Sequence, residues 1–383
     1  MRRGGRRRIG GKPQAACGPP PMDRRAAVPS LDGMHEAGQP HEPRVLIAGG
    51  GVAALEAALA LRDLAGDRLE VEICSPRADF VYRPFAVGTP FGAATVTRYD
   101  LADLAERIGA SFRLAGLFSV DAATKLATAR DGEQIPYDYL LVASGARMLW
   151  AVPGAVTFWG AADEGGFGGV VRRLRAGMLR DVVFTMPGGH SWVLPVYELA
   201  LLAAATLAKS GIEDARLRVV TPEDAPLELF GRAVAEPMVG LLAERGVEVL
   251  TGRHPIAFEA GRLSVAPSEA IETEAVVSLP RLEGRRIDGL PADADGFLLV
   301  DEHCRVAGAR DVFAAGDVTT FAVKQGGIAT RGADAAATAI AAAAGCAVEP
   351  VPFDPVLRGD GKLAGRYLMP FLADREDRLL ASG

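Results

Sequence analysis

Residues 44–66, RVLIAGGGVAALEAALALRDLAG, decide the fold. The short apolar run 45–48 predicts a buried strand, and the Ala- and Leu-rich run after the glycines predicts a helix. Between them, Gly49, Gly51 and Ala54 form the pattern G-x-G-x-x-A. Gly49 permits a tight turn, Gly51 lets a diphosphate approach the backbone, and Ala54 keeps the helix close to the strand. This stretch predicts a dinucleotide-binding βα unit, with a glycine-rich turn that binds nothing as the alternative.

The second predicted strand, LEVEICSP at residues 69–76, places Ser75 where an acidic residue normally binds the ribose hydroxyls, about 20 residues past the glycine motif. Serine can hydrogen-bond a hydroxyl, but without the help of a charge. We therefore expect weaker affinity for the adenosine end of a dinucleotide, with no effect on the fold.

Two later segments, YDYLLVASGAR at 137–147 and ARDVFAAGDVTTF at 309–321, predict buried strands that end in small residues. Ligands of open parallel sheets bind beyond the carboxyl ends of the strands. Asp317, at the end of the second segment, is therefore expected beside the cofactor, where it could accept a hydrogen bond from a ribityl hydroxyl. A helix N-cap is its alternative role.

Together with these motifs, ADFVYRPFAVGTPFG at 78–92 and VKQGGIATRGADAAATAIAAAAG at 323–345 carry a family resemblance. Over about residues 44–355 the chain resembles the FAD-dependent pyridine nucleotide-disulfide oxidoreductase superfamily, and within it sulfide:quinone oxidoreductases and type II NADH dehydrogenases. The resemblance implies an α/β fold with two Rossmann-like dinucleotide-binding domains, the second nested in the first. The implied parts are an FAD-binding domain at 44–150 and 290–355 and an NAD(P)-binding-like domain at 151–289, followed by a tail at 356–383. Residues 1–43 are rich in Gly, Pro and Arg and lack helical or strand periodicity, so we expect them to form a disordered extension.

The resemblance also implies where FAD binds: Leu117 near the adenine, Tyr82–Pro84 near the flavin, and Lys324–Gly327 near its pyrimidine edge. A helix that begins near Gly326 would direct its positive end, with the Lys324 charge, at an anionic reduced flavin. An ordinary Ala-rich core helix after a glycine turn is the alternative. The predicted cofactor-binding residues are Gly49, Gly51, Val52, Ala53, Ala54, Ser75, Pro76, Arg83, Pro84, Leu117, Ala143, Ser144, Gly145, Gly316, Asp317, Lys324, Gln325 and Gly326.

In the predicted nested unit, the first βα turn lies in FTMPGGHSWVLPVYELA at 184–200. It lacks a glycine where a diphosphate would need to approach the backbone, and Pro195 opens the helix. Trp192 is expected to fill space that a nicotinamide nucleotide would cross. At the next strand end Glu223 is the candidate ribose ligand. We expect NAD(P) binding to be weakened or lost.

Four cysteines, Cys17, Cys74, Cys304 and Cys346, lie far apart without a CxxC pair, which favours reduced structural thiols. Cys304 is expected on a surface turn. None matches the redox positions of the sulfide:quinone oxidoreductases that the chain resembles, so the flavin is expected to carry electrons unaided. No metal site is predicted.

The formal net charge is −6 although residues 1–10 are strongly basic, which argues against nucleic-acid binding by the folded part. No segment predicts a transmembrane helix, and we expect a cytoplasmic protein. The apolar residues at 367–372 leave three roles open: packing on the flavin domain, a homodimer interface, or weak peripheral contact with a membrane.

The sequence predicts an FAD-dependent oxidoreductase whose small-molecule electron partner is a quinone or another organic molecule. A non-enzymatic flavin-binding sensor or scaffold and an NAD(P)H dehydrogenase are the alternatives. His190, Trp192, Tyr197 and Lys324 are the side chains expected to approach the open face of the flavin, and none is assigned a catalytic role.

Overall fold

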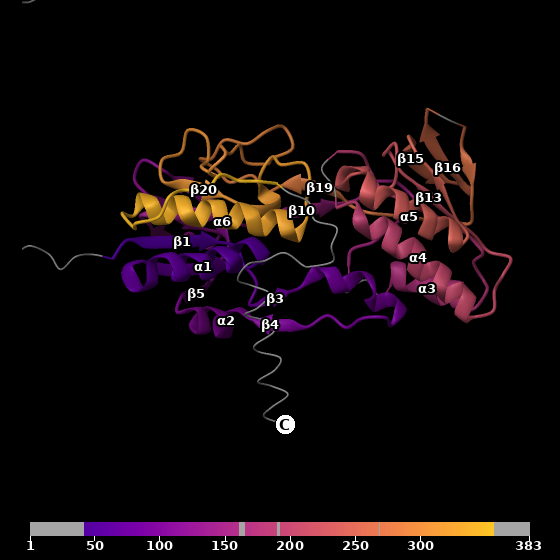
Figure 1. Ribbon diagram of the computed structural model, residues 1–383, viewed down its shortest axis with the longest axis horizontal. Helices are drawn as coiled ribbons and strands as arrows, with labels where there is room; N and C mark the ends of the chain where they lie inside the picture. The colour runs from indigo at the N-terminus through magenta and orange to yellow at the C-terminus, as the bar shows by residue number, and fades with distance from the viewer. Residues whose placement is uncertain (1–41, 161–164, 190–191, 268, 356–383) are drawn as a thin grey trace, which may run out of the picture. The chain divides into compact units, whose positions relative to one another are not determined.

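A computed structural model of the protein describes residues 42–160, 165–189, 192–267 and 269–355. Its frame is two parallel five-stranded sheets, with the strand orders β20-β9-β1-β2-β5 and β11-β18-β12-β13-β14 (Figure 1). The strands of the first sheet are β1 (Arg44–Ala48), β2 (Glu70–Ser75), β5 (Ser111–Leu114), β9 (Tyr139–Val142) and β20 (Val312–Ala314). Those of the second sheet are β11 (Val156–Thr157), β12 (Asp181–Thr185), β13 (Arg216–Val220), β14 (Val247–Leu250) and β18 (Ala275–Ser278).

Each parallel sheet is the centre of three layers. Helices cover one face, and a three-stranded antiparallel sheet covers the other. The helices are α1 (Val52–Ala65), α2 (Leu101–Ile108), α3 (Phe167–Arg175), α4 (Leu194–Lys209), α5 (Arg232–Glu244) and α6 (Gly326–Ala343). The antiparallel strands are β6 (Leu117–Asp121), β7 (Leu126–Ala129) and β8 (Gln134–Pro136) on the first sheet, and β15 (His254–Glu259), β16 (Arg262–Ala266) and β17 (Ile271–Glu272) on the second.

Side chains alternate between the two faces of the first sheet, as the pleat of a strand requires. In β1, Ile47 packs with α1, α2 and α6, whereas Leu46 and Ala48 pack with β6 and β7 on the opposite face. The second sheet repeats this arrangement, because Phe184 of β12 faces α3 and α4 while Val183 faces β15 and β16. Buried on both faces, these strands consist almost entirely of apolar residues.

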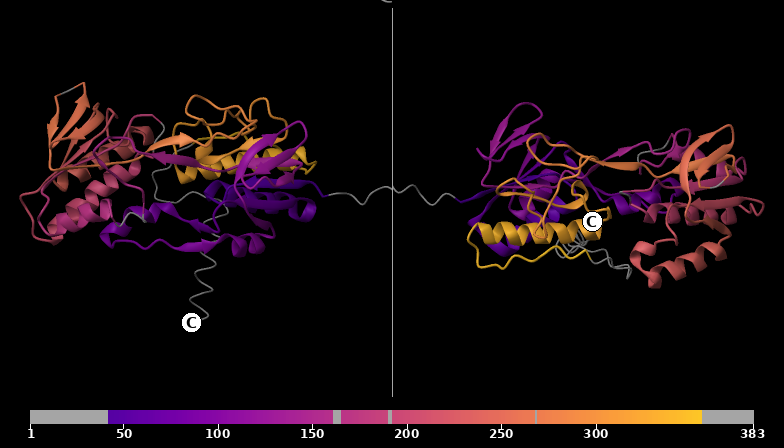
Figure 2. Two further views of the ribbon diagram at one scale, coloured as in Figure 1. Left: turned by 180° about the vertical axis from the view of Figure 1, so that it is seen from behind. Right: turned by 90° about the horizontal axis from the view of Figure 1, so that it is seen from above.

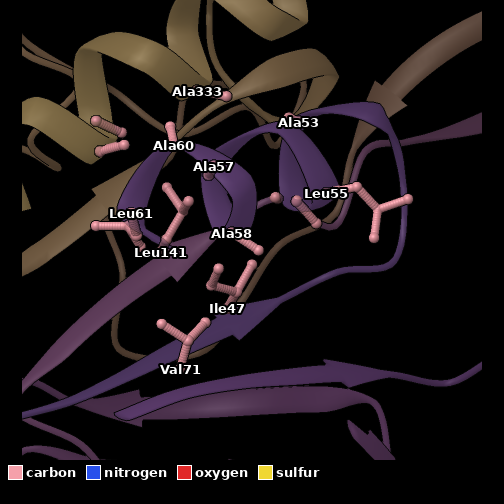
Figure 3. Close-up of a cluster of buried hydrophobic side chains, with 14 of the residues drawn as sticks. Ile47, Ala53, Leu55, Ala57, Ala58, Ala60, Leu61, Val71, Leu141 and Ala333 are labelled. Carbon is pink, nitrogen blue, oxygen red and sulfur yellow. The ribbon is translucent and has the colours of Figure 1, made fainter. Parts of the chain in front are cut away.

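Helices α1 and α6 lie side by side through small residues, as Figure 3 shows for Ala53, Ala57 and Ala60 beside Ala333. Ile47, Val71 and Leu141 rise from the strands toward α1. Helix α1 follows β1, and α6 follows β20 and η5, so both helix N-termini lie close to the ends of these strands. Figure 2 shows this group of elements from behind and from above.

Shorter elements connect these layers. Strands β3 (Asp79–Val81) and β4 (Arg98–Asp100) form one antiparallel pair, and β10 (Ala146–Leu149) and β19 (Arg281–Gly284) form another. Short 3-10 turns are η1 (Gly66–Arg68), η2 (Arg83–Val87), η3 (Thr89–Phe91), η4 (Glu228–Phe230) and η5 (Gly316–Val318). No helix in the described ranges is both long enough and apolar enough to cross a bilayer.

The α/β class with two Rossmann-like units is confirmed, and each predicted strand and helix is found within a few residues of its expected bounds. The domain boundaries 44–150, 151–289 and 290–355 stay predictions. The predicted extension and tail, with the apolar residues 367–372, lie outside the described residues, apart from 42–43 of the extension.

We predict that Ala333→Leu destabilises the protein by about 1–3 kcal/mol, because Ala333 is fully buried at the contact of α6 with α1 and a larger side chain forces the helices apart. Urea unfolding measures the loss. Ala343→Leu, at the exposed last residue of the same helix, is the control and should stay within about 0.5 kcal/mol of wild type. If Ala333→Leu lost no more stability than this control, the contact between α1 and α6 would not be tightly packed.

Candidate functional site

A cavity of about 1340 Å³ lies at the carboxyl ends of the strands. All the predicted cofactor-binding residues line it except Ala54, which is fully buried in the core between α1 and the sheet. The residues that the cavity brings together are Gly49, Gly51, Val52, Ala53, Ser75, Pro76, Arg83, Pro84, Leu117, Ala143, Ser144, Gly145, Gly316, Asp317, Lys324, Gln325 and Gly326.

The β1–α1 turn forms the floor of this cavity. A Cβ at Gly49 would lie 2.1 Å from the carbonyl oxygen of Ala143, so only glycine fits there. A Cβ at Gly51 would meet nothing within 4 Å, which leaves open space in front of the helix. The first backbone N–H groups of α1 have no intrahelical partner and face this space. The turn can therefore receive an anionic group against the backbone.

Two serines lie beside this turn. The Ser144 hydroxyl is buried and has no hydrogen-bond partner among the described residues, so it is available to a ligand in the cavity. Ser75 is buried against Gly50, and its hydroxyl accepts a hydrogen bond of 3.2 Å from the backbone N–H of Arg77. The Ser75 hydroxyl can still donate to a ligand hydroxyl.

Three arginines, Arg77, Arg130 and Arg285, form what we call the arginine cluster. All three line the cavity, and none of their guanidinium groups makes a hydrogen bond or ion pair with another described residue. Arg130 lies over the turn after β5, because a Cβ at Gly116 would be 3.2 Å from its Cδ. Burial, and then the positive charges of Arg130 and Arg77, lower the pKa of the Arg285 guanidinium. The cluster makes this part of the cavity strongly favourable to anions.

Another part of the cavity is lined by Gly316, Asp317 and Lys324. Gly316 has a φ of 79°, and a Cβ there would lie 3.0 Å from the Cβ of Ala53, so η5 and α1 meet at van der Waals distance. Burial raises the pKa of Asp317, while the charges of Lys324 and then Arg83 act in the opposite direction. The N-cap of α6 is Gln325 and that of η5 is Ala315, so the alternative role of Asp317 as an N-cap is not observed.

Lys324 is only 3% exposed. Its Nζ donates to the carbonyl oxygen of Thr319 at 2.5 Å and lies 4.0 Å from the ring centroid of Phe297. Burial lowers the pKa of Lys324 to about 8, although Asp317 and Asp293 partly oppose this change. The protein therefore maintains a poorly solvated cation at the edge of the cavity.

The β12–α4 turn of the second sheet differs physically from the β1–α1 turn. Helix α4 begins with Leu194 and Pro195, and Pro195 has no N–H to offer. The N–H of Val196 donates to the carbonyl oxygen of Val193 at 3.2 Å. Trp192 and the Leu194 side chain line the cavity at this point. This helix start presents apolar side chains where α1 presents free backbone donors.

Glu223 was the candidate ribose ligand of the second unit, but it is not among the residues that line the cavity. Its carboxylate accepts hydrogen bonds from the hydroxyls of Tyr197 and Thr221. The prediction that Tyr197 approaches the flavin is wrong, because Tyr197 is fully buried and its hydroxyl is used by Glu223.

The prediction for Cys304 is also wrong. A turn does form there, with a φ of 60° at Cys304, but the residue is buried rather than on the surface. Cys74, Cys304 and Cys346, the described cysteines, are free thiols. His190 lies outside the described residues.

The cavity continues along an apolar surface that the sequence did not reveal. We call it the apolar wall; its residues belong to the core of the second sheet or pack against it. It consists of Phe158, Trp192, Leu194, Leu227, Phe230, Val234, Met238 and Leu279. Glu198 of α4 also lines the cavity, and burial raises the pKa of its carboxyl. A carboxylate inside an otherwise apolar helix was the available sequence signal for Glu198.

We predict that Lys324→Met changes how stability depends on pH. Because the pKa of Lys324 is lowered from its ordinary value of 10.5 to about 8, the unfolded chain binds up to one more proton than the folded chain between these values. The free energy of unfolding of the wild type therefore rises with pH in this window, by up to about 3 kcal/mol at about 1.36 kcal/mol per pKa unit.

Urea unfolding of the flavin-free protein from pH 7 to pH 10 measures this contribution, which Lys324→Met should abolish. Lys209→Met, at the exposed end of α4, is the control and should keep the wild-type dependence on pH. Parallel curves for all three proteins would contradict the assignment.

Comparisons with known proteins show the family and the fold of this chain. The family model for pyridine nucleotide-disulphide oxidoreductases matches residues 38–185 and 197–343, and thus leaves out 186–196, the β12–α4 turn. An NADH dehydrogenase-like protein of Mycobacterium tuberculosis is 29% identical over 302 residues, which are 72% of each chain.

Among solved structures, the sulfide:quinone oxidoreductase of Aquifex aeolicus is similar with a TM-score of 0.71 and 22% identity, over 78% of this chain and 76% of that one. NDH2 of Plasmodium falciparum, in complex with NADH, has a TM-score of 0.58 and 15% identity over 74% and 66%. These two likenesses show the fold. The family match covers most of the chain, so the protein belongs to the pyridine nucleotide-disulphide oxidoreductase family and is an FAD-dependent oxidoreductase.

Proposed function

We propose that FAD binds along the cradle made by the β1–α1 turn, the arginine cluster and η5. The observations that support this fit are the open space at Gly51, the free N–H groups of α1 and the unpartnered hydroxyl of Ser144. The diphosphate would lie against α1, with the arginine cluster supplying positive charge nearby. Bound FAD supplies two-electron redox chemistry that no side chain of the protein can provide.

We infer that the electron partner is a quinone or another small organic molecule, and that NAD(P)H is a poor donor. The contrast between the two βα turns carries this inference. The start of α1 offers free backbone donors and open space. The start of α4 instead has Pro195, which has no N–H, a Val196 N–H that already donates to a carbonyl oxygen, and the Trp192 ring. A coenzyme with its own diphosphate finds no comparable anchor at the second turn.

We further propose that electrons pass through the flavin without a redox disulfide. Burial raises the pKa of Cys304 to about 12, and burial followed by the charge of Glu72 raises that of Cys74 to about 11. The Cys74 thiol also donates to the carbonyl oxygen of Ala115 at 3.0 Å. Thiols with such pKa values are poor nucleophiles at neutral pH, so neither suits thiol–disulfide exchange.

We predict that Gly51→Val lowers the flavin content of the purified protein at least tenfold, because its side chain occupies the space in front of α1. The protein itself has room for the change, since a Cβ there meets nothing within 4 Å and Gly51 has a φ of −101°. Released FAD, measured by absorbance, gives the result. Gly240→Val on α5, which also has open space at its Cβ, is the control and should keep its flavin. Full flavin content in Gly51→Val would show that the diphosphate binds elsewhere.

We expect NADH and NADPH to reduce the bound flavin slowly. Anaerobic mixing with each coenzyme, followed through flavin absorbance, tests this directly, with dithionite as the control that full bleaching is possible. Rapid bleaching by either coenzyme would mean that the β12–α4 turn still anchors a pyridine nucleotide, and this proposed function would then be wrong.

A further inference from the structure

We propose that the apolar wall is a binding site for an uncharged, planar aromatic molecule, which it selects by excluding charge. This inference rests on the proposed function and deepens it, because it places the electron partner at the second unit of the protein, beside Trp192, Phe230 and Met238.

The core of the second sheet holds the side chains of the apolar wall in place. Trp192, Phe230, Val234 and Met238 each pack on the core of the second sheet and also line the cavity. Val234 and Met238 are four residues apart on α5 and so lie on the same face of that helix, and Phe230, the last residue of η4, lines the cavity with them. These aromatic and aliphatic side chains are already held by the core. A flat apolar ligand can therefore bind against them with little loss of side-chain entropy.

Charge sets this wall apart from the rest of the cavity. The described cavity-lining residues that lie between positions 158 and 280 include no lysine or arginine. Every described cation that lines the cavity comes from other parts of the chain, namely Arg77, Arg83, Arg98, Arg130, Arg285, Arg286 and Lys324. A ligand with a diphosphate would have to bring two negative charges to an apolar surface without a compensating cation, which is costly. An uncharged ligand avoids this cost.

Glu198 supplies one polar group to the same region. Its carboxyl makes no hydrogen bond with another described residue, and burial favours the neutral form of that carboxyl. A protonated carboxyl is a hydrogen-bond donor, so it can satisfy a carbonyl oxygen of a bound molecule. When ionised, the same carboxyl repels anions.

The size of the cavity allows a second molecule. Pockets for a single small ligand are commonly about 300–1,000 Å³, and this cavity, at about 1340 Å³, is larger. The arginine cluster and the β1–α1 turn line one part of it, and the apolar wall lines another. Because these residues line different parts of the cavity, a dinucleotide bound along the cradle would not need to occupy the apolar wall.

The test uses the full-length, flavin-loaded protein and two related probes: menadione, which is uncharged, and 1,4-naphthoquinone-2-sulfonate, which is anionic. Equilibrium dialysis with oxidised flavin measures binding without turnover. We expect wild type to bind menadione at least tenfold more tightly than the sulfonate. Val234→Glu should weaken menadione binding at least tenfold. Val239→Glu is the matched control on the same helix, because Val239 is 45% exposed and does not line the cavity, and it should change binding less than twofold.

Met238→Lys is a second, independent variant, useful if Val234→Glu fails to load flavin. A cation in the wall should weaken menadione binding and strengthen sulfonate binding, and so reverse the preference of wild type. Equal affinities of wild type for the two probes, equal effects of the variants at 234 and 239, or no menadione binding by wild type would overturn the inference. These binding results do not depend on NAD(P)H, whose rapid reduction of the flavin would contradict the proposed function instead.

Discussion

The close approach of backbone segments around the β1–α1 turn is the constraint on which the cavity depends. Gly49 lies against the carbonyl of Ala143, and Gly316 lies against Ala53, with no room for a larger side chain at either contact. These contacts bring the ends of β1, β9 and β20 together and leave backbone N–H groups exposed to the cavity. Because the floor is backbone, its shape is determined by packing between helices and strands rather than by side-chain rotamers.

Charge divides this single cavity into regions with different chemistry. The arginine cluster has no carboxylate partner among the described residues, so this part of the cavity attracts anions. The apolar wall has the opposite character. Under the proposed function, a cofactor with a diphosphate and an uncharged second molecule would occupy separate parts of the cavity.

Most of the fold could be predicted because buried parallel strands and Ala-rich helices leave strong local patterns. Pro195 was expected to open helix α4, and the observed helix runs from Leu194 to Lys209. Its orientation could not be predicted, because it is apolar on nearly every side. Tyr197 faces the core although it was predicted to approach the flavin. Glu198 faces the cavity although no role was predicted for it.

The arginine cluster illustrates a second limit of the sequence. Arg77, Arg130 and Arg285 come from distant segments, and each has an ordinary polar neighbourhood along the chain. Only the strand order brings these three arginines to the same part of the cavity. For Cys304 the polar flanking residues indicated the surface, but the turn directs the residue inward.

The two units share one layered scaffold, and they differ in what a single turn exposes. Wall residues such as Leu227 and Phe158 are also core residues, so the surface that contacts a ligand is anchored by the same packing that stabilises the second sheet. Under the proposed function, apolar substitutions at this surface would change which molecule binds there while adding to the core of the second sheet. Retaining a charged coenzyme at this turn would instead require open space and unused donors, which contribute nothing to folding on their own.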